Sequence, residues 1–350
     1  MKQENKFTRR EFVKRTTIAG AGLALPWKLS LNSARAQVAP QVPLAANAIP
    51  QFVAKLPGLA ELGAIVAGTS EIALEMREFQ AQTLPVGTFQ PGVQPLTWVW
   101  GYLPPGQNSR TTHLGPIIVA TRGIPTQMRY INQLGSTLAS QLLAYKNSTD
   151  QTLAWADPLN DELNACAAAA TLNPPGTPPV GYCAQNYVGS IPACVHIHGG
   201  EVPAWLDGGP DAWYTSDGLH KGHAYYTKPG TTAAGNEAVY RYPNTQEGSP
   251  IWFHDHTLGA TRLNVYAGLA GGYLVLDPAN DPQNLPEGPI PLIIQDRMFD
   301  TNGQLYFPAG VPFIPNPDHP FWVPEFLGDV ICVNGKAWPF LVNVHVRNPN

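Results

Sequence analysis

Two pairs of histidines are the residues of this chain whose types and spacing could do chemistry. His196 and His198 form one pair, and His254 and His256 form the other, each with one residue between them. Each pair lies at the end of a strand-like run, and strand side chains at positions i and i+2 share one face. We therefore expect the four imidazoles to converge on one metal ion or on two adjacent ions.

The identity of that metal follows from the type of ligand. Four neutral imidazoles with no neighbouring thiolate suit copper, zinc or nickel, and Cu(II) binds such sites most tightly. A zinc hydrolase is disfavoured, because no third ligand spacing and no general-base carboxylate follow the pairs. The alternative is that these are core histidines hydrogen-bonded to the backbone. Copper is the cofactor that the pattern favours.

The other histidines do not form such pairs. Two of them, His220 and His223, fall in a polar loop where solvent exposure is the default, although an adventitious metal site there is conceivable. The remaining three, His113, His319 and His345, have no partner in the sequence.

Several neighbours of the pairs should support them. If the strands are regular, Asp255 points away from the imidazoles, which favours a structural hydrogen bond or salt bridge over proton delivery. Trp252 and Tyr266 are expected to be core aromatics rather than redox relays. Arg262 and Asn264 are expected to anchor the loop beside the histidines by hydrogen bonds.

Composition indicates an all-β globular protein. The 350 residues are 44% hydrophobic, which is enough for a large core, and include 33 Gly and 36 Pro, as expected of short strands joined by turns. Only 13% are charged, the net charge is −4, and no basic stripe occurs. Binding to nucleic acid or to a membrane surface is therefore not expected.

Period-2 patterns and turn residues predict where the strands lie. The strand-like runs fall at residues 71–84, 96–106, 114–123, 126–134, 238–244 and 271–278. Residues 134–192 break this pattern and contain an Ala-rich segment, 161–172, that could form a short helix. Asn302-Gly303 and Asn334-Gly335 are predicted hairpin turns.

The first 36 residues are typical of a twin-arginine export signal. Arg9-Arg10 is followed by a mildly apolar stretch and then by Ala34-Arg35-Ala36, a small-x-small cleavage site. The apolar stretch is too short to span about 30 Å of hydrocarbon as a membrane anchor. We expect the mature protein to begin at Gln37 and to be periplasmic or secreted.

Export affects the interpretation of the four cysteines, because the periplasm permits disulfides. Cys166, Cys183 and Cys194 cluster, whereas Cys332 stands apart. The local pairings are Cys183–Cys194 and Cys166–Cys183, and free buried thiols are the alternative. The sequence does not choose among them.

Longer stretches around the histidines resemble the first domain of multicopper oxidases, in the bacterial laccase and bilirubin-oxidase-like branch. The resemblance is carried by HIHGG (196–200), WFHDH (252–256) and TRLNVYAGLAGGYLVLDP (261–278), with weaker similarity in LGPIIVATRG (114–123) and VNGKAWPFL (333–341). It extends from about residue 51 to residue 341, with an insert around Cys166.

The resemblance implies a fold and a ligand set. The fold would be an all-β, cupredoxin-like Greek-key β-sandwich: one complete domain and the start of a second. His196 would be a type 2 copper ligand, and His198, His254 and His256 would be type 3 ligands. Such oxidases reduce O2 to water at three coppers, with electrons taken one at a time from a small-molecule donor at a type 1 copper.

The sequence departs from the family in one respect that concerns catalysis. Family members supply further histidine motifs from a third domain, including a His-Cys-His whose cysteine binds the type 1 copper. In this sequence no cysteine lies between histidines. A copper nitrite reductase or a single blue-copper carrier is disfavoured for the same reason. We expect a chain with half of the trinuclear-cluster ligands, inactive alone and possibly completed by a second chain. The alternative is a non-catalytic periplasmic copper-binding protein or a truncated pseudoenzyme.

The predicted organisation has four parts. After the signal, residues 37–66 form an extended segment, and residues 67–278 form the first cupredoxin-like domain, with the insert around 134–190. Residues 279–350 form an incomplete second domain of the same class.

Overall fold

The computed structural model describes residues 41–142, 155–158, 187, 189–282, 290–307, 309–310, 321–322 and 326–341. These residues belong to one compact unit, Pro40–Asn350. The predicted export signal, the Ala-rich segment, Cys166, Cys183, His319 and His345 lie outside the described residues. No helix among the described residues has the length and apolar character needed to cross a membrane.

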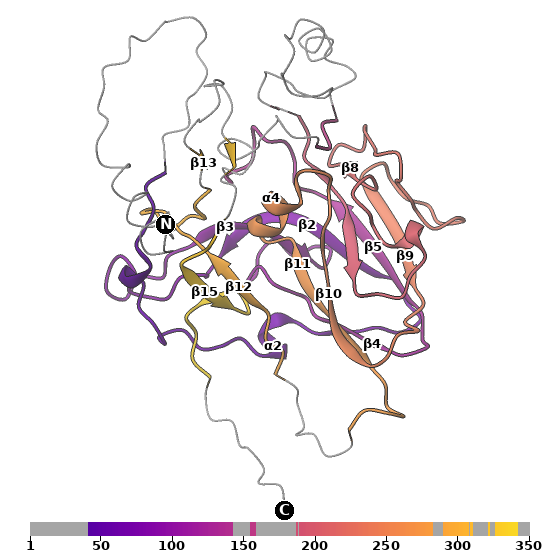
Figure 1. The fold of residues 1–350 in the computed structure, drawn as a ribbon, viewed down its shortest axis with the longest axis horizontal. Helices are drawn as coiled ribbons and strands as arrows, with labels where there is room; N and C mark the ends of the chain where they lie inside the picture. The colour runs from indigo at the N-terminus through magenta and orange to yellow at the C-terminus, as the bar shows by residue number, and fades with distance from the viewer. Residues whose placement is uncertain are drawn as a thin grey trace, which may run out of the picture. The chain divides into compact units, whose positions relative to one another are not determined.

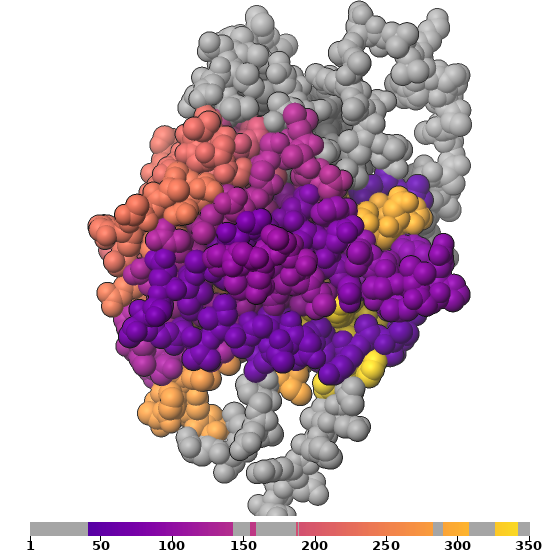
Figure 2. Space-filling model, turned by 180° about the vertical axis from the view of Figure 1, so that it is seen from behind, coloured from indigo at the N-terminus to yellow at the C-terminus, as the bar shows by residue number. Residues whose placement is uncertain are grey.

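Two facing sheets build the body of the protein (Figure 1). The four-stranded sheet has the order β3-β2-β5-β9, and the five-stranded sheet has the order β1-β4-β11-β10-β7. Figure 1 shows β2, β3 and β5 behind β10 and β11, and Figure 2 shows the opposite side, formed mainly by the indigo-to-magenta part of the chain. The predicted all-β, cupredoxin-like β-sandwich is confirmed.

The strands of the two large sheets are short, as the turn-rich composition predicts. They are β1 (Ile65–Val66), β2 (Ile72–Ala81), β3 (Thr97–Leu103), β4 (Ile118–Thr121), β5 (Thr126–Asn132), β7 (Val195–His198), β9 (Glu237–Tyr242), β10 (Ser249–Asp255) and β11 (Ala270–Leu276). β6 (Pro192–Ala193) and β8 (Tyr214–Thr215) form a separate two-stranded antiparallel sheet, and β7 lies between them in the sequence. Each strand-like run identified in the sequence overlaps one of these strands, and four of the six contain the whole strand.

Aromatic side chains fill the space between the sheets. Phe253 on β10 is fully buried, and its ring lies 4.9 Å from that of Tyr102 on β3 and 6.1 Å from that of Tyr130 on β5. Each such pair contributes about 0.5–1.5 kcal/mol beyond the area that it buries. Because Phe253 points into the sandwich, its neighbours Trp252 and His254 must lie on the outer face of the five-stranded sheet.

A smaller sheet packs against the sandwich. It consists of β12 (Ile294–Arg297), β15 (Val330–Val333) and β16 (Lys336–Ala337), and a separate pair is formed by β13 (Ala309–Gly310) and β14 (Phe321–Trp322). The turn between β15 and β16 has positive φ at both Asn334 (53°) and Gly335 (78°), which suits the type I′ hairpin that Asn-Gly predicts. The domain boundaries at residues 67, 278 and 279 stay predictions.

Within the residues that the structure describes, the helical elements are few and short. They are η1 (Ala46–Ala48), α2 (Leu59–Leu62), η3 (Ala204–Leu206) and α4 (Thr261–Ala267). The sequence pattern did not indicate α4, which lies between β10 and β11 and buries Leu263 and Tyr266. Strands β4 and β5 are joined by a short turn but do not pair with each other. β4 belongs to the five-stranded sheet and β5 to the four-stranded sheet, so the turn connects the two sheets.

Candidate metal centre

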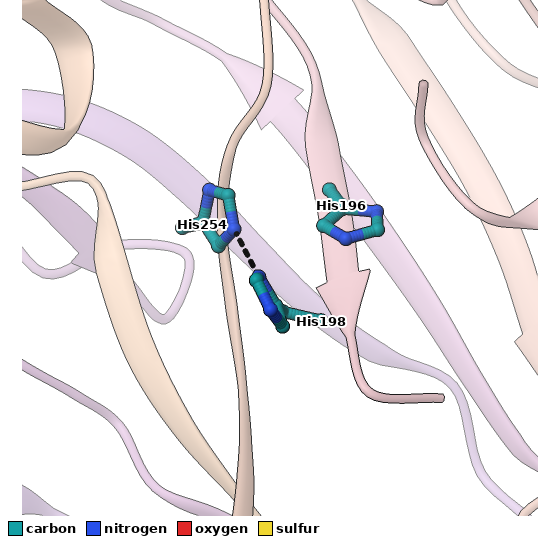
Figure 3. Close-up of side chains that lie close together, drawn as sticks. All are labelled: His196, His198 and His254. Carbon is teal, nitrogen blue, oxygen red and sulfur yellow. Dashed lines mark hydrogen bonds between the residues drawn. The ribbon is translucent and has the colours of Figure 1, made fainter. Parts of the chain in front are cut away.

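The register of two neighbouring strands brings the histidine pairs together. β7 and β10 are antiparallel, and His196 lies directly opposite His254, while His198 lies opposite Trp252. Side chains that face each other across antiparallel strands have Cβ atoms about 4.5–5.5 Å apart. Figure 3 shows the rings of His196 and His198 on one strand and that of His254 on the next, all on the same face.

Three of the four imidazoles form a group of metal-ligand geometry. One nitrogen from each of His196, His198 and His254 lies within 4.8 Å of the others. The closest approach joins Nδ1 of His198 and Nε2 of His254 at 3.0 Å (Figure 3). Two nitrogens bound at about 2.0–2.1 Å to one tetrahedral ion would lie about 3.3 Å apart. The observed spacing is therefore close to that of two ligands of one ion.

Backbone carbonyls determine which nitrogen is available in two of these rings. Nδ1 of His196 lies 2.6 Å from the carbonyl oxygen of Asp207, and Nδ1 of His254 lies 2.7 Å from that of Asp255. Because a carbonyl oxygen only accepts, each Nδ1 must carry the proton and donate. Nε2 of each ring is then unprotonated, as a metal ligand requires, and that of His254 accepts the Nδ1 proton of His198 at 3.0 Å.

His256 lies beside this group but outside the set of three. Its ring centroid is 4.9 Å from that of His196 and 5.8 Å from that of His254. Its Nδ1 is buried and has no hydrogen-bond partner. A buried polar atom without a partner is costly, and a metal ion bound there would satisfy it. The four donors therefore fit copper, although the assignment of each to a type 2 or type 3 copper stays a prediction.

Burial keeps the imidazoles of His196 and His254 neutral at neutral pH. Desolvation lowers the pKa of His254 to about 4, and the three neighbouring imidazoles lower it further against the opposing effect of the Asp255 carbonyl. Desolvation also lowers the pKa of His196, although Asp207 opposes the shift. Since only the neutral ring can ligate a metal, both rings are in the ligating form at neutral pH.

The residues between the histidines point into the protein, as predicted. Ile197 is 1% exposed and packs in the core, and Asp255 is fully buried. The Asp255 carboxylate accepts hydrogen bonds from the backbone amide of Cys194 at 3.1 Å and from the amide and hydroxyl of Thr257 at 3.0 and 2.8 Å. It therefore ties the start of β7 to the end of β10, and the predicted structural hydrogen bond is confirmed.

The loop that follows β7 supplies support that the sequence did not reveal. Gly208 has a φ of +70°, and a Cβ atom there would lie 1.8 Å from the carbonyl oxygen of Val195. The carbonyl oxygen of the preceding residue, Asp207, accepts both the Nδ1 proton of His196 at 2.6 Å and the backbone amide of Ile197 at 3.3 Å. The only sequence signal was the Asp-Gly-Gly run at 207–209, which indicates a tight loop.

The predictions for the neighbouring side chains had mixed outcomes. The prediction that Trp252 is a core residue is wrong, because its side chain is 37% exposed. Trp252 and His254 are two residues apart in β10 and therefore point to the same, outer face of the sheet. Tyr266 is a core aromatic as predicted, 6% exposed. Arg262 donates to the Gly259 carbonyl at 2.6 Å, and the Asn264 amide donates to the Pro192 carbonyl at 3.3 Å, so both anchor the loop as predicted.

The two cysteines that the structure describes do not take part in the group of imidazoles. Cys194 and Cys332 are free and buried. The Cys183–Cys194 pairing is therefore wrong, whereas Cys166–Cys183 lies outside the described residues. The Cys194 thiol instead contacts the carbonyls of Gly208 and Gly209 at 3.7 and 3.5 Å. Burial raises the pKa of Cys332 to about 12, which keeps it an inert thiol.

The described histidines outside the pairs form no metal group. His113 is 2% exposed, and its Nε2 lies 3.1 Å from the side-chain oxygen of Gln295. His220 and His223 lie in the loop after β8, where His223 is exposed. Within the described ranges, the set on β7 and β10 is the one group of three or more histidine, cysteine or acidic side chains with metal-ligand spacing.

Comparisons with known proteins place laccases among the sequence relatives of this chain. The chain is 41% identical over 163 residues to a laccase of Bacillus subtilis (strain 168), a match that covers 45% of this chain and 29% of that laccase. It is 29% identical over 342 residues to a laccase of Haloferax volcanii, covering 96% of this chain and 46% of that laccase. The chain therefore spans between about a quarter and a half of the length of these relatives. No protein-family model matches the sequence.

Among solved structures, the multicopper oxidase McoA of Aquifex aeolicus is 18% identical with a TM-score of 0.47, over 84% of this chain and 43% of that one. A β-sandwich with clustered imidazoles on one sheet is an arrangement that can hold copper. Over the matched residues, the sequence is similar to laccases and to proteins named multicopper oxidases, and this similarity implies copper as the cofactor.

Proposed function

We propose that this chain contributes to a copper-dependent, laccase-like oxidoreductase, which couples the one-electron oxidation of a small-molecule donor to the reduction of O2 to water. The observation that carries the proposal is the convergence of His198 Nδ1 and His254 Nε2 at 3.0 Å, with His196 completing a group within 4.8 Å. The similarity to laccases of two organisms supports it. When bound, copper would supply the one-electron redox chemistry.

The residues of this chain have distinct parts in the proposal. His196 would hold a type 2 copper, and His198, His254 and His256 would hold type 3 coppers. The carbonyls of Asp207 and Asp255 orient two of these rings by accepting their Nδ1 protons. Burial of His254 excludes water from one side of the group.

The opposite side of the group is open, because His198 is exposed. Four imidazoles leave three coppers short of ligands, and we propose that polypeptide beyond these two strands, either in the same protein or in a second chain, supplies the rest. The type 1 copper and the donor site would lie there as well. On this proposal the isolated chain binds copper but does not turn over.

A second candidate, suggested by the same open side, is a non-catalytic periplasmic copper-binding protein or a truncated pseudoenzyme. An exposed ligand set exchanges its metal more readily than a closed one. The two candidates predict different results when the missing copper ligands are supplied. The laccase-like oxidoreductase becomes active, whereas the non-catalytic protein or pseudoenzyme does not.

Copper loading of the mature chain tests the proposal. The chain is loaded anaerobically, and metal stoichiometry, the blue absorption of a type 1 site and the oxidation of a phenolic dye are measured. We expect bound copper without blue colour or turnover. The double variant His198→Gln/His254→Gln should lose most of this copper, whereas His223→Gln, which changes an exposed loop histidine, should retain it.

Two results would contradict the proposal. A blue and active preparation would show that this chain holds a type 1 site. A chain that binds no copper, or a double variant that binds as much as the parent, would favour histidines with a purely structural role.

We also propose that the chain reaches the periplasm, or is secreted, through the twin-arginine pathway. The support is the Arg9-Arg10 pair and the Ala34-Arg35-Ala36 cleavage site. Replacing both arginines by lysine should trap the precursor in the cytoplasm, as measured by fractionation and the mass of the mature N-terminus. Unchanged export of the lysine variant would contradict the proposal.

A further inference from the structure

An indole lies against two of the candidate ligands. Trp252 faces His198 directly across the β7–β10 ladder and precedes His254 by two residues on the same face of β10. Its ring centroid is 5.0 Å from that of His198 at an interplanar angle of 25°, and 4.1 Å from that of His254 at 30°. Both contacts are stacked, so one indole contacts the two rings whose nitrogens approach each other.

We propose that Trp252 is a positioning residue, which holds the rings of His198 and His254 in the orientation that makes their nitrogens converge. An exposed histidine such as His198 would otherwise rotate about its side-chain torsions, and ordering it would reduce the free energy of metal binding. The indole removes that freedom before the metal arrives. The part of the proposal that concerns copper affinity rests on the proposed function, but the part that concerns ring order does not.

The surroundings of Trp252 indicate that core packing is not its main role. The side chain is 37% exposed and lines an apolar cavity of about 780 Å³, together with Ile251 and Ile294. Its partner on the other neighbouring strand, β11, is Gly272, which presents no side chain. Of the two residues directly opposite Trp252 in the ladder, only His198 on β7 therefore presents a side chain to the indole.

The chemistry of the ring suits a neighbour that becomes positively charged. The face of an indole carries partial negative charge, and tryptophan is the strongest of the aromatic residues in attracting cations. An imidazole that ligates copper shares the charge of the ion, whereas a neutral imidazole does not. Stacking on Trp252 should therefore strengthen when the metal binds, which an aliphatic side chain of similar size could not reproduce.

Three variants separate ring stacking from bulk. Trp252→Leu removes the aromatic face, and Trp252→Phe retains a smaller one. Ile294→Ala is the control: it removes apolar surface from the same cavity and leaves the contacts between Trp252 and the imidazole rings in place. In the copper-free protein, the rate at which diethyl pyrocarbonate modifies His198 and His254 is followed by peptide mass spectrometry. We expect a several-fold increase for Trp252→Leu, a smaller one for Trp252→Phe and none for Ile294→Ala.

Copper binding gives the second measurement. Cu(II) affinity is determined by competition with a chelator, and the number of coordinated nitrogens is taken from the electron paramagnetic resonance spectrum. Trp252→Leu should weaken binding about tenfold and lose one nitrogen ligand, whereas Trp252→Phe should stay within about threefold of the parent. Circular dichroism of each variant shows whether it has folded.

The outcomes distinguish this proposal from the one on function. If Trp252→Leu leaves the modification rates at the parent values, or if the Leu and Phe variants behave alike, Trp252 does not position the rings. If the parent binds no copper, the proposed function fails, and the modification rates of the copper-free chains still decide whether Trp252 orders the imidazoles.

Discussion

Protonation of His113 should destabilise the fold at mildly acidic pH. This histidine is 2% exposed, and burial lowers its pKa to about 3, with smaller contributions from Arg297 and Lys336 against the opposing hydrogen bond of Gln295. The pKa in the folded state is below the value of 6.5 for an exposed histidine, so the unfolded chain binds the proton first. Stability is therefore full above pH 6.5 and is lost as the pH falls from there toward 3.

The magnitude follows from the two pKa values. Between pH 7 and pH 5, the difference in proton binding lowers the free energy of unfolding by about 2 kcal/mol for this one group. The contact at risk joins the sandwich to the small sheet, because Gln295 lies on β12 and the neighbouring Thr112 hydroxyl donates to the carbonyl of Asn334 at 2.8 Å. Loosening of the small sheet should accompany the loss.

Urea unfolding at pH 5 and pH 7 measures the effect. His113→Asn removes the titrating group, so the loss of unfolding free energy between the two pH values should be smaller by about 2 kcal/mol than in the parent. His223→Asn is the control, because that side chain is exposed. A comparison of differences also cancels the contributions of His196 and His254. If His113→Asn loses as much stability as the parent between pH 7 and pH 5, the account of His113 is refuted.

Four further predictions concern packing, loop geometry and metal binding. Phe253→Ala should lower the free energy of unfolding by about 3–5 kcal/mol in urea titrations, because it empties the space between the sheets; a loss below 1 kcal/mol would contradict this packing. Gly208→Ala should cost at least about 2 kcal/mol and weaken copper binding, since its Cβ would meet the Val195 carbonyl; unchanged melting and affinity would be inconsistent with that contact. Asn132→Leu should cost about 2–3 kcal/mol, because its buried amide donates to the carbonyls of Ile191 and Tyr214 at 2.9 Å; a neutral effect would show that these carbonyls find other donors. Removing copper from the loaded chain with a chelator should lower its melting temperature, by an amount equivalent to about 2.7 kcal/mol at 100 times the dissociation constant, and an unchanged melting temperature would argue against binding to the folded state.

Local sequence was sufficient to predict several strands of the sandwich and the common face of each histidine pair. Period-2 alternation in residues 71–84 and 126–134 predicts strands that the structure contains as β2 and β5. Asn334-Gly335 predicts a hairpin because few other dipeptides adopt positive φ at both positions. The spacing of each histidine pair likewise places its two rings on one face, since a strand repeats every two residues.

Other features depend on residues that are far apart in the chain. The pairing of His196 with His254 joins positions 58 residues apart, and no local pattern specifies the register of such a pair. The helix α4 is short, and the tertiary contacts of Leu263 and Tyr266 with the core stabilise it more than its own propensity does.

The sequence by itself determined the class of fold, the type of metal ligand and the face on which each histidine pair lies, because these follow from side-chain chemistry and from the two-residue period of a strand. Only the tertiary structure decided that Trp252 lies outside the core and stacks on two imidazoles, and that the Asp207 carbonyl orients His196. Those contacts depend on the order and register of strands in the sheet, which the burial of Phe253 and of the other inward side chains selects over the whole domain.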